Sequence, residues 1–301
     1  MRRLDWIVII LLIIGAIGSK LVDFGSFVPE NANPRRPSVE LFTPKLWDKE
    51  TKAWLAKGPA TQKSNLPWIT SLPKEGFIED KGAKKSSTGS AFSVSNRGVW
   101  LTARHVAEGC DKAVIQVGEK KALGVKRTVL HPNADVAILI TRNAPPEFPV
   151  AARLEGARDA FNIGFPKGQP GAVHSRLIGE MTLRHVRRGQ RNGGYRERVN
   201  AWAERSRVPA RDGSLGGLSG GAVLDEHGRV IGVVQAESAR RGRIMTAKPS
   251  TIAEAFSYAK VSIPASGIGP AEPELTKDSY PMTARRLITT LRIAKVYCRV
   301  N

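Results

Sequence analysis

The chain has 301 residues, of which 41% are hydrophobic and 25% charged, so it can form a sizeable folded core and is not expected to be disordered over most of its length. Its 47 Lys and Arg residues outnumber its 27 Asp and Glu residues, which gives a formal charge of +20. No nucleic-acid-binding signature accompanies this charge, so we expect no dedicated nucleic-acid site. The basic residues form either a plain solvated surface or a surface attracted to an anionic membrane.

The first 85 residues predict an export signal followed by a stalk. Arg2 and Arg3 precede an uncharged apolar run at 6–18, which is shorter than the roughly 20 residues of a full membrane span. Ala16-Ile17-Gly18 fits the cleavage site of a signal peptide, whereas the many isoleucines and leucines of the run, and the hydrophobic residues beyond Lys20, favour an uncleaved hydrophobic helix that anchors the chain. Both alternatives place the remainder outside the cytoplasm, on the periplasmic side. Residues 26–85 contain seven prolines among polar residues, which predicts a stalk that partly packs on the next domain.

From residue 87 the pattern changes to short apolar runs separated by turn residues, which is typical of an all-β chain. We expect a first set of strands at 91–95, 99–103, 112–117, 123–130 and 136–141, with a hairpin turn at 96–98. His105 follows the second of these runs, and Asp135 stands at the start of the last one.

A connector rich in proline and alanine at 143–156 leads to a second set of runs. We expect these strands at 160–165, 172–183, 196–204, 222–236 and 244–248. Thr251 and Glu254 fit a capping box that opens a short helix over 251–260. The C-terminal extension beyond 262 includes an amphipathic stretch at 283–296 and is too short for a PDZ domain.

The glycine-dense turn GSLGGLSGGAV at 213–223 has the composition of an oxyanion hole. Its glycines allow backbone conformations closed to other residues, so the amides of Gly217 and Ser219 can point into one small space. Ser219 as a nucleophile needs a base, which His105 can supply, and an orienting carboxylate, which Asp135 can supply. Each signal alone is weak, but the three together in the order His, Asp, Ser indicate nucleophilic catalysis.

The blocks TARHV, ADVAIL and GLSGGAV resemble those of the chymotrypsin-like (trypsin-like) serine peptidases, in particular the bacterial HtrA/Deg-like branch. NIGFPKGQPG, at 162–171, resembles the stretch that opens the second barrel in that branch. Pattern and resemblance together imply two six-stranded antiparallel β-barrels with the site in the crevice between them, and a short C-terminal helix. The predicted units are listed in chain order: a signal or anchor at 1–25, an N-terminal extension at 26–85, a peptidase domain at 86–262 and a C-terminal extension at 263–301.

The resemblance also bears on activation and specificity. Leu218 stands where zymogen-activated members carry an aspartate, so activation by a freed amino terminus is not expected. Gly213 occupies the position at the base of the specificity pocket, which implies small or medium apolar side chains rather than Lys or Arg at the cleaved position. The pocket wall is expected from the strand residues Val234, Gln235 and Ala236.

The leading hypothesis is a serine endopeptidase in the bacterial envelope that acts on protein or peptide substrates without a cofactor or metal. A catalytically silent pseudo-peptidase that binds or scaffolds other proteins is the alternative, and a basic polyanion-binding protein is a third hypothesis. Cys110 and Cys298 belong to no CxxC or Cys/His cluster, so they either pair as a disulfide or remain free thiols. The oligomeric state stays open.

Overall fold

A computed structural model of the chain describes residues 72–80, 85–118, 121–156, 158–187, 194–210, 213–238, 242–262 and 274–301. The predicted signal or anchor at 1–25 and most of the predicted stalk lie outside these ranges. Within them, no helix combines the length and the apolar character needed to cross a membrane.

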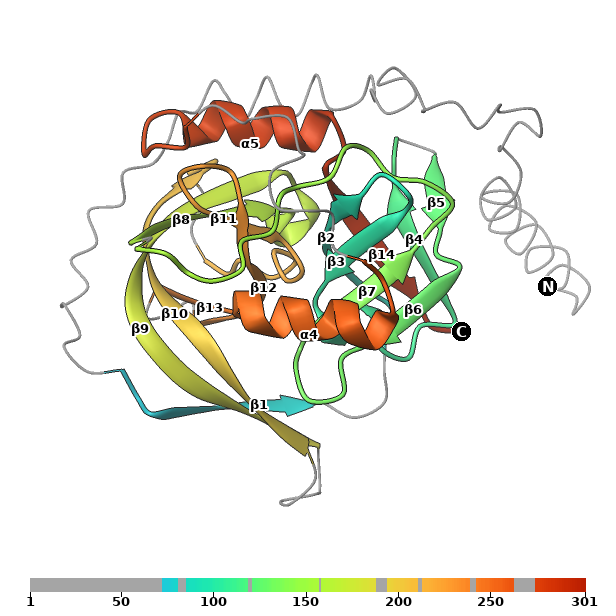
Figure 1. Cartoon of the computed structure of the whole chain (residues 1–301), viewed down its shortest axis with the longest axis horizontal. Coiled ribbons are helices and arrows are strands. Elements are labelled where there is room, and N and C mark those ends of the chain that lie inside the picture. The colour runs from blue at the N-terminus through green and yellow to red at the C-terminus, as the bar shows by residue number, and fades with distance from the viewer. Residues whose placement is uncertain are drawn as a thin grey trace, which may run out of the picture.

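The first sheet curls on itself and takes one strand from the C-terminus of the chain (Figure 1). Its strands are β2 (Ser87–Ser95), β3 (Val99–Thr102), β4 (Lys112–Gln116), β5 (Ala122–Gly124), β6 (Arg127–Leu130), β7 (Ala137–Ile140) and β14 (Ile293–Arg299). They are ordered β5-β4-β14-β2-β3-β7-β6. The predicted strand at 123–130 is divided into β5 and β6. Val125 and Lys126 lie between the two strands. Val125 donates its N–H to Ala113 O in β4, and Lys126 donates its N–H to Ile140 O in β7. β5 and β6 are thus consecutive in the chain but form the two opposite edges of the sheet.

The C-terminal extension is part of this first sheet. β14 lies between β2 and β4, with Ile293 opposite Phe92 and Val296 opposite Ile115. The predicted amphipathic stretch at 283–296 is therefore not one element, because α5 (Tyr280–Thr289) precedes β14. Leu291 adopts a left-handed conformation (φ 59°) between them, which no helix can continue through.

The second sheet closes into a six-stranded barrel. Its strands are β8 (Asp159–Gly164), β9 (Gly171–Arg187), β10 (Gly194–Val208), β11 (Ala222–Leu224), β12 (Val230–Ser238) and β13 (Arg243–Thr246). The order β9-β10-β13-β12-β11-β8 is completed by pairing of β8 with β9. The all-β double-barrel prediction is confirmed, with the first barrel formed as a curled sheet.

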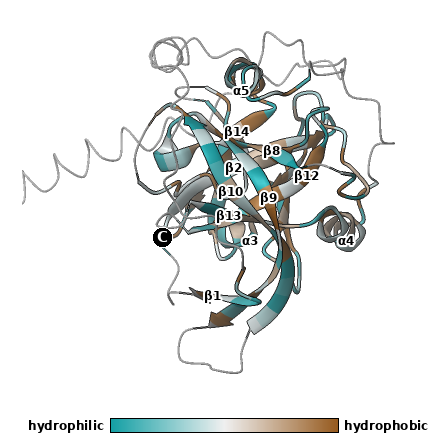
Figure 2. Ribbon diagram, turned by 90° about the vertical axis from the view of Figure 1, so that its left-hand side faces the viewer, coloured by the Kyte–Doolittle hydropathy of each residue, from teal (hydrophilic) through white to brown (hydrophobic). Residues whose placement is uncertain are grey.

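The β9–β10 ribbon extends beyond the barrel and carries a further strand, β1 (Glu75–Asp80) (Figures 1 and 2). β1 pairs with β9 in parallel. Ile78 of β1 packs against a small apolar cluster that includes Met181, Leu183 and Val199. Part of the extension predicted at 26–85 thus packs on the second sheet.

A hydrophobic core spans both sheets and the two long helices, with Phe92 from the first sheet, Phe161 from the second and Phe256 from α4 (Pro249–Ala259). α4 contacts β7 and β12, and α5 contacts β9 and β14, so each helix bridges the two barrels. The predicted capping box is wrong. The helix begins at Pro249, whose fixed φ suits a first helical position, and Thr251 is buried in its first turn.

Candidate active site

The first sheet supplies the histidine and the aspartate. β3 ends at Thr102, and the short helix α3 (Arg104–Ala107) starts directly after it. His105 Nδ1 lies 2.7 Å from Asp135 Oδ2, and the backbone N–H of His105 donates to Asp135 Oδ1 at 2.8 Å. The Asp135 side chain is 2% exposed, whereas that of His105 is 50% exposed. One buried carboxylate therefore orients the ring and fixes the backbone that carries it.

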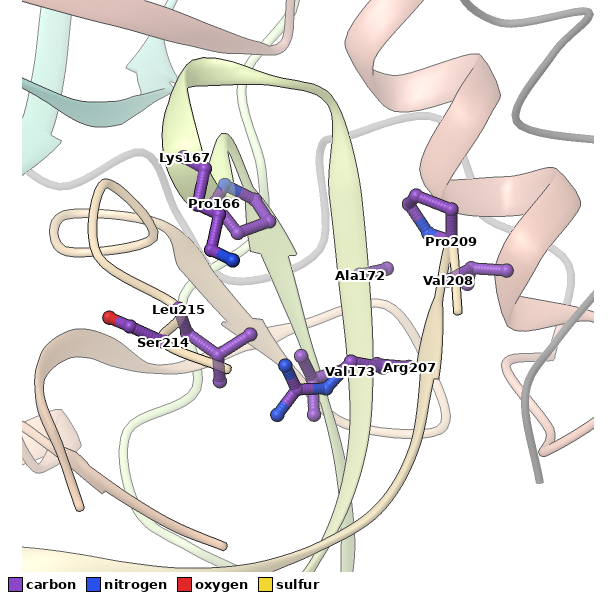
Figure 3. Close-up of a pocket in the computed structure, with 9 residues that line it drawn as sticks. All are labelled: Pro166, Lys167, Ala172, Val173, Arg207, Val208, Pro209, Ser214 and Leu215. Carbon is purple, nitrogen blue, oxygen red and sulfur yellow. The ribbon is translucent and has the colours of Figure 1, made fainter. Parts of the chain in front are cut away.

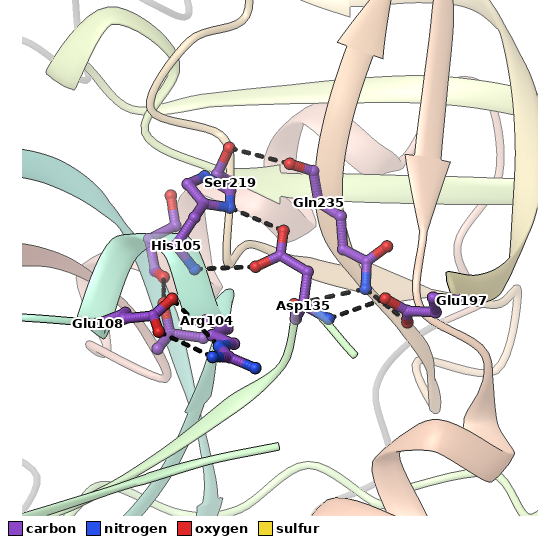
Figure 4. A network of polar contacts seen from close by, with 9 residues as sticks. Arg104, His105, Glu108, Asp135, Glu197, Ser219 and Gln235 are labelled. Carbon is purple, nitrogen blue, oxygen red and sulfur yellow. Dashed lines mark hydrogen bonds and ion pairs between the residues drawn. The ribbon is translucent and has the colours of Figure 1, made fainter. Parts of the chain in front are cut away.

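The second sheet supplies the serine, in the turn before β11. The N–H of Ser90 in β2 donates to the carbonyl of Ser219 at 2.8 Å, which brings this turn against the first sheet. Ser219 Oγ lies 3.4 Å from the carbonyl oxygen of Gln235 in β12. Figure 4 shows Ser219, His105 and Asp135 gathered at one place between the sheets.

The close approach of this turn requires glycine after the serine. Gly220 has a φ of +81°, and a Cβ there would lie 2.1 Å from Ser90 O and 2.3 Å from Thr102 Oγ1. Since Thr102 is the last residue of β3 before the histidine helix, any side chain at position 220 would push Ser219 away from His105.

The predicted oxyanion turn leaves its two amides available. Gly217 has a φ of +93°, and its carbonyl accepts a hydrogen bond from Ser90 Oγ at 2.8 Å. Leu218 donates its N–H to Leu215 O at 2.8 Å. Within the described part of the chain, the N–H groups of Gly217 and Ser219 have no hydrogen-bond acceptor. They can therefore donate to an incoming oxyanion.

A pocket of about 230 Å³ lies beside the serine. It is lined by Leu215, Gly216, Leu218, Ser219, Val234, Ala236, Glu237 and Ile244. The sequence-predicted Val234 and Ala236 are among them. Gln235 is not, because alternate residues of β12 face opposite sides and its side chain turns inward. Gly213 is also outside this lining, and its carbonyl accepts a hydrogen bond from Arg207 Nη1 at 2.9 Å.

Glu237 crosses from β12 to the opposite wall of this pocket. Its carboxylate accepts the N–H of Leu215 at 2.7 to 2.8 Å, and also the hydroxyl of Ser214. The carboxylate is thus held by the turn, and the remaining pocket walls are largely apolar.

A second hollow, of about 310 Å³, lies near the start of the same turn (Figure 3). It is lined by Pro166, Lys167, Ala172, Val173, Arg207, Val208, Pro209, Ser214 and Leu215. Leu215 lines both hollows, so the two lie next to each other.

A buried carboxylate that sequence reasoning missed lies behind Asp135. The backbone N–H of Asp135 donates to Glu197 Oε2 at 2.8 Å, and Gln235 Nε2 donates to Glu197 Oε1 at 2.7 Å (Figure 4). Burial, with a smaller contribution from the charge of Asp135, raises the pKa of Glu197 to about 7. A glutamate in the arginine-rich sequence of β10 resembles a surface residue, so only the alternation of the strand could have placed it inside.

Arg104, next to the histidine, is a second residue missed from sequence. Its guanidinium donates to the carbonyls of His131 and Pro132 at 2.9 and 3.0 Å and pairs with Glu108. It also lies 5.2 Å from the centre of the Tyr195 ring. Arg104 thus ties α3 to the segment that leads to Asp135.

Tyr195 in turn stacks on His185, with ring centres 4.2 Å apart. Burial raises the pKa of Tyr195 and lowers the pKa of His185. The end of the β9–β10 ribbon therefore packs as an uncharged aromatic wall near the histidine helix.

The two cysteines form a disulfide. Cys110 follows α3 and Cys298 lies in β14, and their Cα atoms are 5.3 Å apart. The alternative of two free thiols, which the sequence left open, does not occur in this structure.

Comparison with known proteins adds a family to this geometry. The family described as trypsin-like peptidase domain matches residues 89–233, a span that contains His105, Asp135 and Ser219. No curated protein matches the chain.

Solved structures similar to the chain include the active form of the Rv3671c protease from M. tuberculosis. Its identity is 18% and the TM-score 0.49, covering 65% of this chain and 94% of that one. The HtrA-type protease AlgW with a decapeptide has 20% identity and a TM-score of 0.44, covering 57% of this chain and 51% of that one. The MamO protease domain from Magnetospirillum magneticum has 15% identity and a TM-score of 0.41, covering 56% and 93%.

Proposed function

The chain is a trypsin-like serine peptidase through the domain at residues 89–233, and from this premise we propose that Ser219, His105 and Asp135 form its catalytic triad. The observation that carries the proposal is the double contact of the buried Asp135 carboxylate with the ring and the backbone N–H of His105. A carboxylate at Nδ1 fixes the imidazole tautomer whose Nε2 can accept a proton.

In the proposed reaction, Ser219 Oγ attacks the carbonyl carbon of the scissile peptide bond while His105 removes the hydroxyl proton. The amides of Gly217 and Ser219 stabilise the negative charge on the carbonyl oxygen. His105 then transfers the proton to the leaving amine, and the C–N bond breaks to give an acyl-enzyme. A water molecule, deprotonated by His105, hydrolyses the ester and frees Ser219. Asp135 stabilises the imidazolium throughout.

We propose a small or medium apolar side chain at the cleaved position of protein or peptide substrates. The pocket beside Ser219 is small, and Leu218, Val234 and Ile244 make its walls apolar. Glu237 also lines it, but the Leu215 amide and the Ser214 hydroxyl occupy its carboxylate. We therefore do not expect Glu237 to select Lys or Arg at the cleaved position.

We further propose that the enzyme works in the bacterial envelope, exported or membrane-anchored through residues 1–25. The basic flank and apolar run of that segment support export. A disulfide is favoured outside the reducing cytoplasm, which is consistent with the same location. To test this, the full chain is expressed in a bacterium, and spheroplasts are treated with an added protease. Digestion of the domain in intact spheroplasts is expected, and complete protection would contradict export.

The activity is tested with the purified full chain and an unfolded protein substrate. We expect cleavage by the wild type, with new termini after small or medium apolar residues, and none by Ser219→Ala. Full activity in Ser219→Ala would overturn the assignment of the nucleophile. A folded wild type that cleaves no unfolded protein would favour the pseudo-peptidase.

A further inference from the structure

Glu197 lies at the junction of the two barrels, behind the site rather than in it. It belongs to β10 of the second barrel, yet one of its carboxylate oxygens accepts the backbone N–H of Asp135, which belongs to the first. The other oxygen accepts the side-chain amide of Gln235 in β12. Glu197 is only 5% exposed and Gln235 only 2% exposed, so neither contact is shared with bulk solvent.

Both groups that face the Glu197 oxygens are donors. An ionised carboxylate can accept from both at once, whereas a protonated carboxyl group must turn its own O–H toward one of them. Glutamine at this position would present an NH₂ group to a donor in the same way. With Gln235 turned so that its Nε2 donates, as it lies in this structure, the ionised form accepts from the Asp135 amide and the Gln235 amide together, although burial opposes ionisation.

The strand that carries Gln235 also touches the serine, since the Gln235 carbonyl lies 3.4 Å from Ser219 Oγ. A continuous set of contacts thus runs from the Asp135 peptide through Glu197 and Gln235 to Ser219. Because the serine and the aspartate come from different barrels, these contacts set their relative position.

We propose that Glu197 is a positioning residue, whose ionised carboxylate holds the Asp135 peptide of the first barrel against Gln235 of the second. This inference rests on the proposed function, in which Asp135 orients His105. Loss of the ionised carboxylate releases the Asp135 peptide and misaligns the imidazole without removing any group that touches substrate. The charges of Asp135 and of Glu254 in α4 both raise the pKa of Glu197, and Tyr195 of β10 also interacts with this carboxylate.

The activity test compares wild type, Glu197→Gln and the matched control Asp225→Asn. Asp225 is also a buried carboxylate of the second barrel, but its partners all lie in its own turn: the N–H groups of His227 and Arg229 and the guanidinium of Arg229. The rate constant for modification by a small fluorophosphonate is measured against pH with each full-length protein. The ratio of the wild-type to the variant rate constant is compared at each pH.

We expect Glu197→Gln to react about 10- to 100-fold more slowly than wild type at about pH 8.5, as small misplacements of catalytic groups do. The ratio should approach 1 at about pH 5.5, because protonated Glu197 and glutamine are then alike. Asp225→Asn should follow the wild type throughout. A ratio near 1 at the higher pH, or one that does not change with pH, would overturn the proposal.

A second readout needs no reaction at Ser219. Hydrogen exchange of the Asp135 amide is measured by NMR in the same three proteins, with the amides of Ala137–Ile140 in β7 as the internal control for folding. We expect Glu197→Gln to lose protection at Asp135 and to keep it in β7. Unchanged protection at Asp135 would overturn the role of Glu197 even if the wild type proved unreactive, whereas an unreactive wild type with the expected exchange pattern would contradict the proposed function alone.

Discussion

Cys110 and Cys298 join the segment that follows the histidine helix to the last strand of the first barrel, although 188 residues separate them in the chain. β14 is not an appendage, because it lies between β2 and β4 and pairs with both. The disulfide therefore links β14, the last strand of the chain, to the segment that follows the histidine helix in the same barrel.

Replacing both cysteines by serine should lower the free energy of unfolding by about 2 to 5 kcal/mol, since a crosslink over a long loop mainly restricts the unfolded chain. Chemical denaturation of the full chain measures this. A reductant should produce a similar loss in the wild type and no further loss in the double variant. Equal midpoints for wild type and variant would contradict the prediction.

Asp135→Asn should lower kcat by about 10⁴-fold, the loss that the same change causes in this enzyme class. The asparagine amide presents an NH₂ group to the imidazole and favours the tautomer that cannot accept the serine proton. Steady-state kinetics with a peptide substrate test this, and circular dichroism controls for folding. A loss below about tenfold would mean that Asp135 does not orient His105.

Ile244→Ala should enlarge the pocket beside Ser219 and shift its preference toward larger apolar side chains. Ile244 is buried and lines the pocket wall. Kinetics on a peptide series with Ala, Val, Leu or Phe at the cleaved position measure the change. We expect the Phe-to-Ala ratio of kcat/KM to rise about 10- to 200-fold, the range that added methylene groups contribute in apolar pockets. An unchanged ratio would place the specificity pocket elsewhere.

The pKa of Glu197 predicts a pH-dependent difference in stability between wild type and Glu197→Gln. Burial raises this pKa from 4.5 to about 7, so the folded state binds the proton more tightly than the unfolded state. In the wild type, this tighter proton binding contributes to the free energy of unfolding. The contribution is fully present below about pH 4.5 and is lost as the pH rises to about 7, a change on the order of 3 kcal/mol. Glu197→Gln has no carboxyl group at this position, so its free energy of unfolding does not show this decrease.

Thermal or urea unfolding of both proteins across this range tests the sign. The variant should gain stability relative to wild type as the pH rises, while it loses activity. The lowered pKa values of His131 and His185 affect both proteins alike and cancel in the difference. If the free energy of unfolding of the variant minus that of the wild type stayed constant or fell as the pH rises, the burial of an ionised Glu197 would be contradicted.

Local sequence signals located the strands and the three motif residues. The turn at 96–98 and the glycines around Ser219 are local signals, and each leads into an apolar run that forms a strand. Non-local pairing was not predictable in the same way. The sequence IAKVYCR of β14 fits a strand, but nothing in it shows that its partners are β2 and β4, about 200 residues earlier.

The missed parts of the site depend on three-dimensional contacts that leave no motif. Glu197 matters because Asp135 and Gln235 face it, and these three residues lie far apart in the chain. The family resemblance implies that Gly213 lies at the base of the pocket, whereas the turn holds its carbonyl toward Arg207. The strands β9 and β10 also extend beyond their predicted ends, to 171–187 and 194–208.

The most direct test of the central claim is labelling of the purified full chain by a fluorophosphonate probe, beside Ser219→Ala and His105→Ala. A single modification of the wild type at Ser219, absent from both variants, is the predicted result, because the probe reacts only with a serine that a nearby base activates. Labelling that persists in Ser219→Ala, or a folded wild type that does not react at all, would contradict an assembled catalytic triad.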